Sequence, residues 1–476
     1  MSAAPSRRAC EGLLWLILFF APAAFGATEW WSRAVLEGLI FCLAAMCAAR
    51  RDFHVPVSAP LGGFGVILGI GCLQLLQAHP ANQPLGLIPF TVSRPQTVYA
   101  LNFWAALTAL YWSASGIFRW DGALRRASWA IFGTGLFIAV VGILQRGQGN
   151  TAYYGFRPIR PDSVPFGPFT NPNHAANWMA ASTLVGAGLV WDLLPRRSLP
   201  LSDRAAQMVL GAFLICLSGA AVLATRSRGG THALLLSALF TAGLVAIRGR
   251  LRLFLMGGVA LAGAAYAGVL YAHPKWIGLI GSAVDGSAGE RLSMYRSGLR
   301  LLADFPVFGT GLGGFQTAFV AYKEPIVHAA VDHLHSSWLE VALEAGVFGA
   351  AALGASFLWP IAALGRRLAG AGSGAPAAGL FAAALALVLH GLVDFNFQIA
   401  ANAAVMAVIL AAVTARLAPG EGRPVPVGGS RAPLAAVFLV LALLSLPPGL
   451  YGGRPRLGAP FALPGDSLVA RAAVKP

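Results

Sequence analysis

Apolar runs long enough to cross a lipid bilayer recur along this chain of 476 residues, and they constrain its fold more than any other feature. A helix of about 18 to 20 apolar residues spans the hydrocarbon core and satisfies its backbone polar groups internally. The segments of this kind are residues 12–26, 34–49, 60–78, 98–117, 127–145, 174–194, 206–224, 230–247, 253–271, 337–364, 376–393, 398–415 and 433–449. We therefore expect an all-α polytopic membrane protein with about 12–14 transmembrane helices.

The composition supports this class and excludes others. Charged residues make up 11% of the chain, against about 25% in soluble domains. The net charge of +16 comes mostly from arginines in short loops, and without a nucleic-acid motif we expect no nucleic-acid partner. The stretch "RRACEGLLWLILFFAPAAFGA" near the N-terminus imitates a signal peptide. Ahead of so many later segments, an uncleaved first helix is expected.

Basic residues fall on alternate loops between the apolar segments. They are Arg7, Arg8, Arg50, Arg51, Arg119, Arg125, Arg126, Arg196, Arg197, Arg204, Arg248, Arg250, Arg252, Arg366, Arg367, Arg416, Arg423 and Arg431. By the positive-inside rule, this side faces the cytoplasm. The outer side then carries two longer loops, residues 146–173 and 272–336, which would be periplasmic in a Gram-negative cell.

The stretch "DHLHSSWLEVALEAG" places several ionisable groups at the start of an apolar segment. Ser337 and Glu340 have the spacing of a capping box, which makes Ser337 the predicted N-cap. His335 would then lie just outside the helix, where the positive end of the helix dipole favours a neutral imidazole and a bound anion. Such a ring can accept a proton. A solvated histidine at the membrane interface is the plainer alternative.

His333 and His335 are also candidate ligands of a zinc site, with His328 or His174 as further ligands. The spacing fits no standard zinc pattern, and no cysteine assists. We therefore expect no metal and no cofactor. Glu344, one turn inside the helix, is a further site candidate, with a hydrogen bond between packed helices as its plainer role.

A very short outer hairpin, "ATRSRGGTHALL", carries Arg226 and Arg228 against the positive-inside bias. Charges at the membrane boundary that face a bundle interior are functional candidates by default. A guanidinium fork suits two phosphate oxygens at once. Snorkelling to outer lipid headgroups is the plainer alternative for both residues.

The loop of residues 272–336 contains an apolar stripe at helical spacing with arginines beside it. The stripe is Leu292, Tyr295, Leu299 and Leu302, and the arginines are Arg291, Arg296 and Arg300. This pattern predicts an amphipathic helix at the membrane interface. The "GTGLGG" that follows lacks the preceding strand and the lysine of a nucleotide-binding loop. We expect it to be a turn that sets the loop onto the helix bundle.

The loop of residues 146–173 offers flat rings for stacking on sugars and added positive charge. These candidates are Tyr153, Tyr154, Phe156, Arg157 and Arg160. At the end of the loop, Asn171 and Asn173 are expected as turn and N-cap residues of the next helix.

Four of these stretches together resemble the O-antigen ligase and polymerase superfamily. "GPFTNPNHAANW" is similar to its Gly-x-Phe-x-Asn-x-Asn block, and "TRSRGG" is similar to its Ser-Arg-Gly block. "ERLSMYRSGLRLLADFPVFGTGLGGF" is similar to its arginine-containing helix and Pro-x-x-Gly-x-Gly turn. "HLHSSWLEVALEAGVFG" is similar to its His-Asn/Ser-x-x-Leu-x-x-x-x-Glu-x-Gly block. The resemblance covers roughly residues 160–350, and "LVDFNFQIAAN" at 392–402 is a weaker echo.

The resemblance implies a GT-C-like membrane fold and a metal-independent inverting glycosyltransferase. Such enzymes take a glycan from an undecaprenyl-diphosphate carrier on the outer leaflet. Ligases pass it to a lipid A-core, polymerases to another carrier-linked repeat, and other relatives to protein. The implied division is N-terminal helices (1–145), a catalytic membrane region (146–364) and C-terminal helices with a tail (365–476).

Carried over residue by residue, the resemblance makes His335 the catalytic histidine, and Arg228 and Arg291 the arginines that hold the diphosphate. Ser336 stands where asparagine is common after that histidine, which bears on the orientation of His335. The expected partners are the carrier-linked glycan, an acceptor glycolipid or glycan, and membrane lipids.

The chemistry of the residues agrees with this function. Glycosyl transfer builds negative charge on the departing diphosphate and requires the acceptor hydroxyl to lose its proton. Positioned cations and a base meet these needs. A transporter or flippase for lipid-linked sugars is the alternative of another class, although most segments carry no internal charge apart from Glu344 and His390. A non-catalytic scaffold of an envelope complex is a second alternative.

Overall fold

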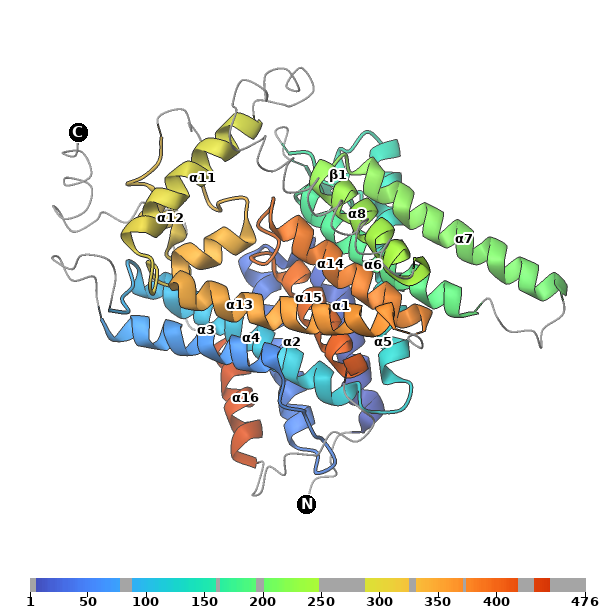
Figure 1. The fold of residues 1–476 in the computed structure, drawn as a ribbon, viewed down its shortest axis with the longest axis horizontal. Helices are drawn as coiled ribbons and strands as arrows, with labels where there is room; N and C mark the ends of the chain where they lie inside the picture. The colour runs from blue at the N-terminus through green and yellow to red at the C-terminus, as the bar shows by residue number, and fades with distance from the viewer. Residues whose placement is uncertain are drawn as a thin grey trace. The chain divides into compact units, whose positions relative to one another are not determined.

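The computed structural model describes residues 6–77, 88–159, 163–193, 201–247, 287–324, 331–370, 374–417 and 432–445, which are almost wholly helical (Figure 1). Their α-helices are α1 (Arg7–Ala23), α2 (Trp30–Ala48), α3 (Ala59–Leu76), α4 (Arg94–Ile117), α5 (Ala123–Gly147), α6 (Pro172–Leu193), α7 (Leu201–Ala224), α8 (Arg228–Ala246), α11 (Ser287–Asp304), α12 (Phe315–Phe319), α13 (Ser337–Ala369), α14 (Ala375–Gly391), α15 (Ala400–Leu417) and α16 (Ala432–Leu444). A short 3-10 helix, η1 (Phe25–Ala27), and an antiparallel hairpin of β1 (Ala152–Tyr153) and β2 (Arg157–Pro158) join them.

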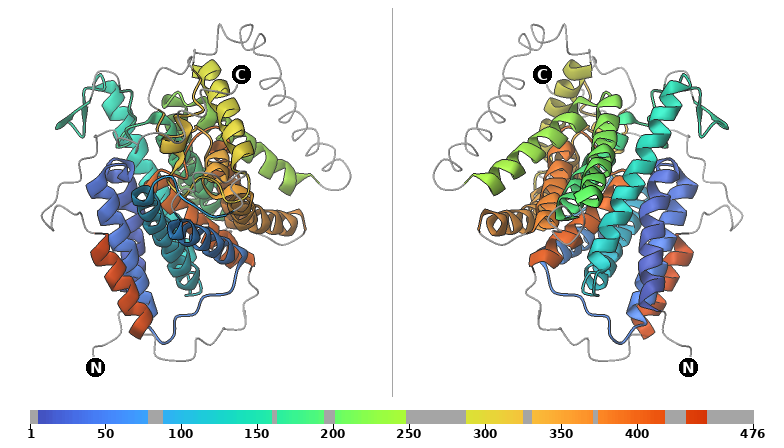
Figure 2. Two further views of the ribbon diagram at one scale, coloured as in Figure 1. Left: turned by 90° about the vertical axis from the view of Figure 1, so that its left-hand side faces the viewer. Right: turned by 90° about the vertical axis from the view of Figure 1, so that its right-hand side faces the viewer.

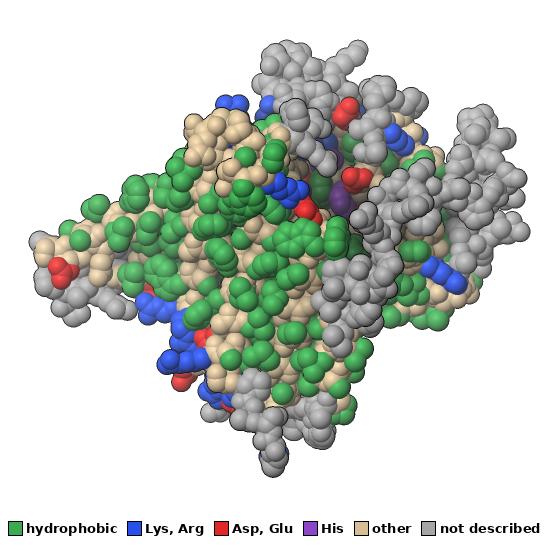
Figure 3. All heavy atoms as spheres, turned by 180° about the vertical axis from the view of Figure 1, so that it is seen from behind, with side chains coloured by type: hydrophobic (Ala, Val, Ile, Leu, Met, Phe, Trp, Pro, Cys, Tyr) green, Lys and Arg blue, Asp and Glu red, His purple; other side chains and the backbone are tan. Residues whose placement is uncertain are grey.

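The predicted apolar segments correspond to these helices, except that the segment 253–271 lies outside the described residues. Seven of the described helices are long and apolar enough to cross a membrane. Hydrophobic side chains also dominate the molecular face seen in Figure 3. Several large hydrophobic residues are exposed, among them Trp191, which is 67% exposed, and Leu239, which is 69% exposed. The protein is therefore an all-α polytopic membrane protein, as predicted.

The helices form two compact units, each built from segments far apart in the sequence. The first comprises Met1–Gly62, Ala105–Arg252 and Ala355–Pro447, and the second comprises Gly63–Trp104, Leu253–Gly354 and Pro448–Pro476. The predicted boundaries after residues 145 and 364 stay a prediction.

In the first unit, α6 is buried along most of its length and packs against α5, α7, α8 and α14. Small residues bring α6 and α14 together, as is usual between membrane helices. A Cβ atom on Gly188 would lie 2.7 Å from the carbonyl oxygen of Ala375, and one on Gly379 would lie 2.7 Å from that of Leu184. Elsewhere in this unit, α1, α2 and α16 pack side by side (Figure 2).

Ion pairs join loops at one end of the first unit. Glu11 in α1 accepts two hydrogen bonds from Arg126 at the start of α5, at 2.8 and 2.9 Å. Asp52, after α2, accepts from Arg7 at 2.7 Å and from Arg50 at 2.9 Å. These residues lie in or beside the basic loops that the sequence assigns to one side of the membrane. The structure thus gathers basic loops together, while the assignment of that side to the cytoplasm stays a prediction.

Contacts also join helices and loops at the opposite end of the first unit. The hydroxyl of Tyr154 donates to the carbonyl oxygen of Ala23, the residue that ends α1, at 2.6 Å. The side chain of Asn402, in α15, donates to the carbonyl oxygen of His174, in α6, at 3.2 Å. The predicted outer loop of residues 146–173 therefore lies at the end of the unit away from the basic loops.

The second unit contains the predicted amphipathic helix, α11, and three residues of the predicted stripe, Leu292, Tyr295 and Leu302, are buried or pack against its core. Leu299 is 38% exposed, whereas Leu301 is 1% exposed. A core forms beneath the helix from side chains of four segments. Its buried members are Met294, Leu301, Phe315, Phe319, Leu334 and Leu343. The pattern predicted the helix and most of its buried face correctly, but Leu299 of the predicted stripe is exposed, and Met294 and Leu301 pack into the core without having been predicted.

Helix α13 is broken at Gly346, whose φ of 67° and ψ of −168° lie in a region that is essentially open to glycine alone. The break leaves the carbonyl groups of Leu343 and Glu344 outside the regular helical ladder. The backbone N–H groups of Thr310 and Gly311 donate to them at 2.9 and 3.1 Å. The predicted "GTGLGG" turn therefore docks into the break, within the second unit.

Gln74 of α3 binds the same break from another side, and its side chain is fully buried. Its amide nitrogen donates to the carbonyl oxygens of Phe308 and Glu344 at 2.7 and 2.9 Å. Its amide oxygen accepts from the N–H of Leu312 at 3.0 Å. One side chain thus holds both the broken helix and the glycine-rich turn.

Candidate functional site

The predicted site residues fall in both compact units. Arg157, Asn173, Arg226 and Arg228 belong to the first unit, and Arg291, His333, His335 and Glu344 belong to the second. Arg160 and His328 lie outside the described residues. Within each unit, the structure shows which candidates share a local framework.

His335 lies just outside α13, as predicted, but the N-cap is Ser336 and not Ser337. The hydroxyl of Ser336 accepts a hydrogen bond from the N–H of Leu339 at 3.4 Å. His335 itself has a φ of 58°, in the left-handed region that few side chains adopt. The hydroxyl of Tyr295 donates to the carbonyl oxygen of His335 at 2.8 Å and so holds this backbone in place.

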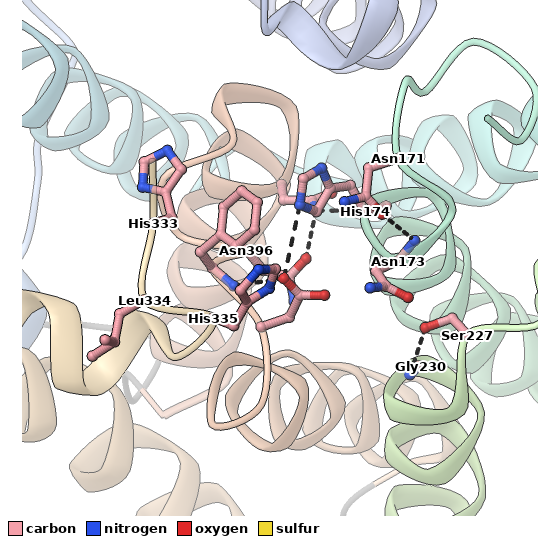
Figure 4. A network of polar contacts seen from close by, with 12 residues as sticks. Asn171, Asn173, His174, Ser227, Gly230, His333, Leu334, His335 and Asn396 are labelled. Carbon is pink, nitrogen blue, oxygen red and sulfur yellow. Dashed lines mark hydrogen bonds and ion pairs between the residues drawn. The ribbon is translucent and has the colours of Figure 1, made fainter. Parts of the chain in front are cut away.

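Glu340 binds two residues of the loop that carries His335. One carboxylate oxygen accepts from the N–H of Leu334 at 2.8 Å, and the other lies 2.7 Å from Nδ1 of His333. The predicted reach of Glu340 toward the N-cap is therefore replaced by a reach into the preceding loop. Leu334 is fully buried between the two histidines, and Figure 4 shows these three residues on one loop. The loop is anchored on both sides of its central leucine.

The pKa of His333 is raised above its ordinary value. Burial disfavours the charged ring, but the charge and hydrogen bond of Glu340 outweigh it, with further help from Glu344 and Asp332. His333 is thus built into the framework as the partner of Glu340. This contact gives His333 a structural role alongside its predicted candidacy for the site.

We expect the contact between His333 and Glu340 to make stability depend on pH. Because the folded pKa is raised, this contribution is fully present below the unfolded value of about 6.5 and is lost as pH rises through the folded value. Thermal midpoints of the purified protein, taken from about pH 6 to pH 9, should fall more steeply than those of His333→Asn. Parallel curves for the two proteins would show that this contact does not stabilise the fold.

Glu344 is buried where the broken helix meets α12. Its side chain is 8% exposed, and Oε1 accepts from the N–H of Phe315 at 3.3 Å. The residue therefore makes the packing hydrogen bond that the sequence offered as its plainer role.

Arg291 lies on α11, one turn before Tyr295, so the two side chains leave the same face of that helix. Since Tyr295 binds the backbone of His335, the face of α11 that carries Arg291 is the one joined to the histidine loop. The second unit thus brings two of the three principal candidates into one framework.

In the first unit, the turn that carries Arg226 and Arg228 is held by the hydroxyl groups beside them. Thr225 accepts from the N–H of Ser227 at 3.0 Å, and Ser227 accepts from the N–H of Gly230 at 3.2 Å as the N-cap of α8 (Figure 4). Arg226 has a φ of 60°, and both arginines have exposed side chains. The turn presents them outward at the positive end of α8.

The glycines after Arg228 let α8 approach its neighbours. A Cβ atom on Gly229 would lie 3.0 Å from the ring of His390, and one on Gly230 would lie 2.5 Å from Cβ of Ala176. His390 is 1% exposed. Sequence reasoning noted His390 as an ionisable group within a segment, but it did not place it against this turn.

A buried polar cluster lies near the starts of α6 and α15. The amide of Asn402 donates to Oδ1 of Asn396 at 3.0 Å, and Nε2 of His174 lies 3.9 Å from Oδ1 of Asp394. All four residues are at most 3% exposed. This cluster was not predicted from the sequence, although the polar residues in "LVDFNFQIAAN" within an apolar region were a usable signal.

The two asparagines before α6 have different roles. Oδ1 of Asn171 accepts from the N–H of Asn173 at 2.9 Å, which makes Asn171 the capping residue (Figure 4). Asn173 lies inside the first turn of α6, so its side chain is not needed as a cap. Asn173 remains a candidate for contact with a substrate.

The hairpin of β1 and β2 uses most of its aromatic and basic residues for packing within the first unit. Arg157 forms an ion pair with Glu29, and its guanidinium lies 4.4 Å from the ring centre of Phe25. Tyr153 is only 5% exposed, whereas Phe156 is 74% exposed. Of the predicted stacking residues, Phe156 presents an open ring and Tyr153 does not.

A family model described as O-antigen ligase matches residues 212–354. The matched stretch includes six candidate residues, namely Arg226, Arg228, Arg291, His333, His335 and Glu344. No curated protein matches the chain.

Proposed function

We propose a function from the premise that the chain belongs to the O-antigen ligase and polymerase superfamily. The protein transfers a glycan from an undecaprenyl-diphosphate carrier to an acceptor hydroxyl at the periplasmic face of a bacterial inner membrane. The ligase reaction, with a lipopolysaccharide core as acceptor, is the first form of this proposal. Polymerisation of a surface polysaccharide or exopolysaccharide, with a second carrier-linked glycan as acceptor, is the alternative within the superfamily.

One observation carries the proposal. The hydroxyl of Tyr295 binds the carbonyl oxygen of His335, and Tyr295 lies one turn from Arg291 on α11. A base for the acceptor and a cation for the leaving group are therefore supported by one rigid framework. Positioned groups of this kind lower a barrier because their orientation is established before the reaction.

In the proposed reaction, the acceptor oxygen attacks the anomeric carbon as the bond from that carbon to the diphosphate oxygen breaks. The diphosphate leaves with the electron pair, and His335 takes the proton of the acceptor hydroxyl. Arg228 and Arg291 stabilise the charge that develops on the diphosphate. Arg226, Asn173, Arg157 and Arg160 are further candidates for contact with the donor. A single displacement inverts the configuration at the anomeric carbon.

We expect this transfer to survive removal of divalent metal ions, because arginines supply the positive charge that the leaving group needs. Purified protein would be given a carrier-linked glycan with a lipopolysaccharide core or a second carrier-linked glycan as acceptor. Product formation would be followed after exhaustive chelation. Product on the core indicates a ligase, and a lengthened carrier-linked glycan indicates a polymerase. Activity that disappears on chelation and returns with zinc would contradict the arginine mechanism.

Transport of lipid-linked sugars is the competing function, and one feature favours it. Transporters often bind ions at the carbonyl groups of broken helices, and α13 is broken beside Glu344. Here, however, the carbonyl oxygens of Leu343 and Glu344 accept hydrogen bonds from the glycine-rich turn and from Gln74. Because protein donors already bind these carbonyl groups, the break supports the catalytic framework better than an ion site.

A further inference from the structure

Arg146, in the last turn of α5, is a partly buried cation that was not predicted as a site residue from the sequence. Its Nε and Nη2 atoms are buried, and neither has a hydrogen-bond partner among the described residues. A buried charge is costly unless it is paired and hydrogen-bonded. At the end of a membrane helix, such a group is a functional candidate.

The edge formed by Nε and Nη2 is the one that binds two oxygens at once. Elsewhere in the first unit, Arg126 uses this edge to bind both carboxylate oxygens of Glu11, at 2.8 and 2.9 Å. Arg146 presents the same pair of donors, and no described carboxylate binds them. The two arginines lie at opposite ends of α5, so one helix carries a guanidinium bound to a carboxylate and a guanidinium whose Nε and Nη2 have no acceptor in the described part of the chain.

The surroundings of Arg146 hold the guanidinium in place. Its central carbon lies 5.7 Å from the ring centre of Phe166. Phe166 is fully buried, and a Cβ atom on Gly142 would lie 2.1 Å from its ring. Gly142 is one turn before Arg146, so a glycine on the same helix face makes room for the ring beneath the cation.

The charged group that acts on Arg146 is another arginine. Arg226, in the turn before α8, is close enough for its positive charge to act on Arg146. Arg228 follows two residues later, at the positive end of α8. Like charges repel, so this grouping is unfavourable for the protein alone and becomes favourable when an anion lies among the arginines.

Stabilisation of the α5 dipole is the plainer role for a cation in the last turn of a helix. That role needs only a charge near the helix end. It does not account for two buried donors on one edge, or for the placement of Arg146 near Arg226.

We propose that Arg146 binds two oxygens of a phosphate group, together with Arg226 and Arg228, in an anion site at this end of the first unit. The phosphate belongs to the diphosphate of the glycan carrier. The identity of this donor rests on the proposed function, whereas the anion site rests on the geometry of Arg146.

The test measures binding of inorganic diphosphate to the full-length protein in phosphatidylcholine nanodiscs, by ligand-dependent thermal shift. Arg146→Gln should weaken binding about tenfold or more, because charge-assisted hydrogen bonds are lost. Arg146→Lys should lie between the two, since it keeps the charge and loses the fork. Arg125→Gln, which removes an exposed arginine from the other end of α5, should bind within about twofold of the parent.

Unchanged diphosphate binding in Arg146→Gln would overturn the site, whether or not glycan transfer is observed. If that variant does not fold, full parental binding in Arg146→Lys would show that the guanidinium of Arg146 does not bind two phosphate oxygens at once. Arg146-dependent binding in a protein that transfers no glycan would support the site and reject the donor. Adding phosphatidylglycerol to the nanodiscs tests whether the phosphate bound at this site comes from a bilayer lipid and not from the glycan carrier. Loss of diphosphate binding on its addition would assign the phosphate to bilayer lipid and overturn the donor assignment.

Discussion

His335→Asn is expected to lower the rate of glycan transfer by about 10²–10⁴-fold, the usual range for a positioned acid–base group. Asparagine keeps the left-handed backbone that His335 adopts, and it leaves the bond from Tyr295 to the backbone intact. The loss should therefore come from the missing base and not from a changed loop. Initial rates of purified protein, at equal amounts of folded protein, provide the measurement.

His333→Asn is the matched control for the histidine base. It removes the neighbouring imidazole, whose contact with Glu340 is structural, and it should cost far less activity once folded protein is equalised. A His335→Asn variant within a few-fold of the parent would remove the base from the mechanism. Transport would then be the better account of the protein.

Gly346→Ala is expected to destabilise the protein by about 3 kcal/mol or more, through strain and a backbone clash. The backbone conformation at Gly346 is essentially restricted to glycine, and a Cβ atom there would lie 2.1 Å from the carbonyl oxygen of Val307. Relief requires the glycine-rich turn to leave the break in α13. Detergent-solubilised protein should show a lower thermal midpoint and less monodisperse material in size-exclusion chromatography.

Gly354→Ala provides a control on the same helix. No described atom outside the adjacent helical backbone lies within 4 Å of a Cβ atom at Gly354, and alanine is the better helix former by about 1 kcal/mol. This variant should match or slightly exceed the parent in stability. Equal midpoints for Gly346→Ala and Gly354→Ala would show that the break in α13 is not required for the fold.

The helices and the position of His335 were predictable because their signals are local. Apolar length alone identified the membrane helices, and a serine followed by a glutamate marked the start of α13. The N-cap was placed one residue late because Ser336 and Ser337 are chemically equivalent in sequence. What chose between them was Glu340, which binds Leu334 and His333 in the loop before the helix.

Other parts of the site depend on contacts that local patterns do not encode. Gln74 and Glu344 are 270 residues apart in the chain and joined by one hydrogen bond. The cluster of His174, Asp394 and Asn402 likewise unites distant segments. Arg146 appeared in the sequence as one more arginine at a helix end. Only the structure shows that its Nε and Nη2 atoms are buried with no hydrogen-bond acceptor among the residues described.

The position of Gln74 limits how this protein can be recombined with its relatives. The family match begins at residue 212 and ends at residue 354, yet the glycine-rich turn inside it is held by Gln74, and Thr97 donates to the carbonyl oxygen of Leu312 at 2.8 Å. A chimera that exchanges only the matched stretch would separate these donors and acceptors from their partners. Exchange of residues 63–104 together with that stretch keeps both sides of each bond from one parent.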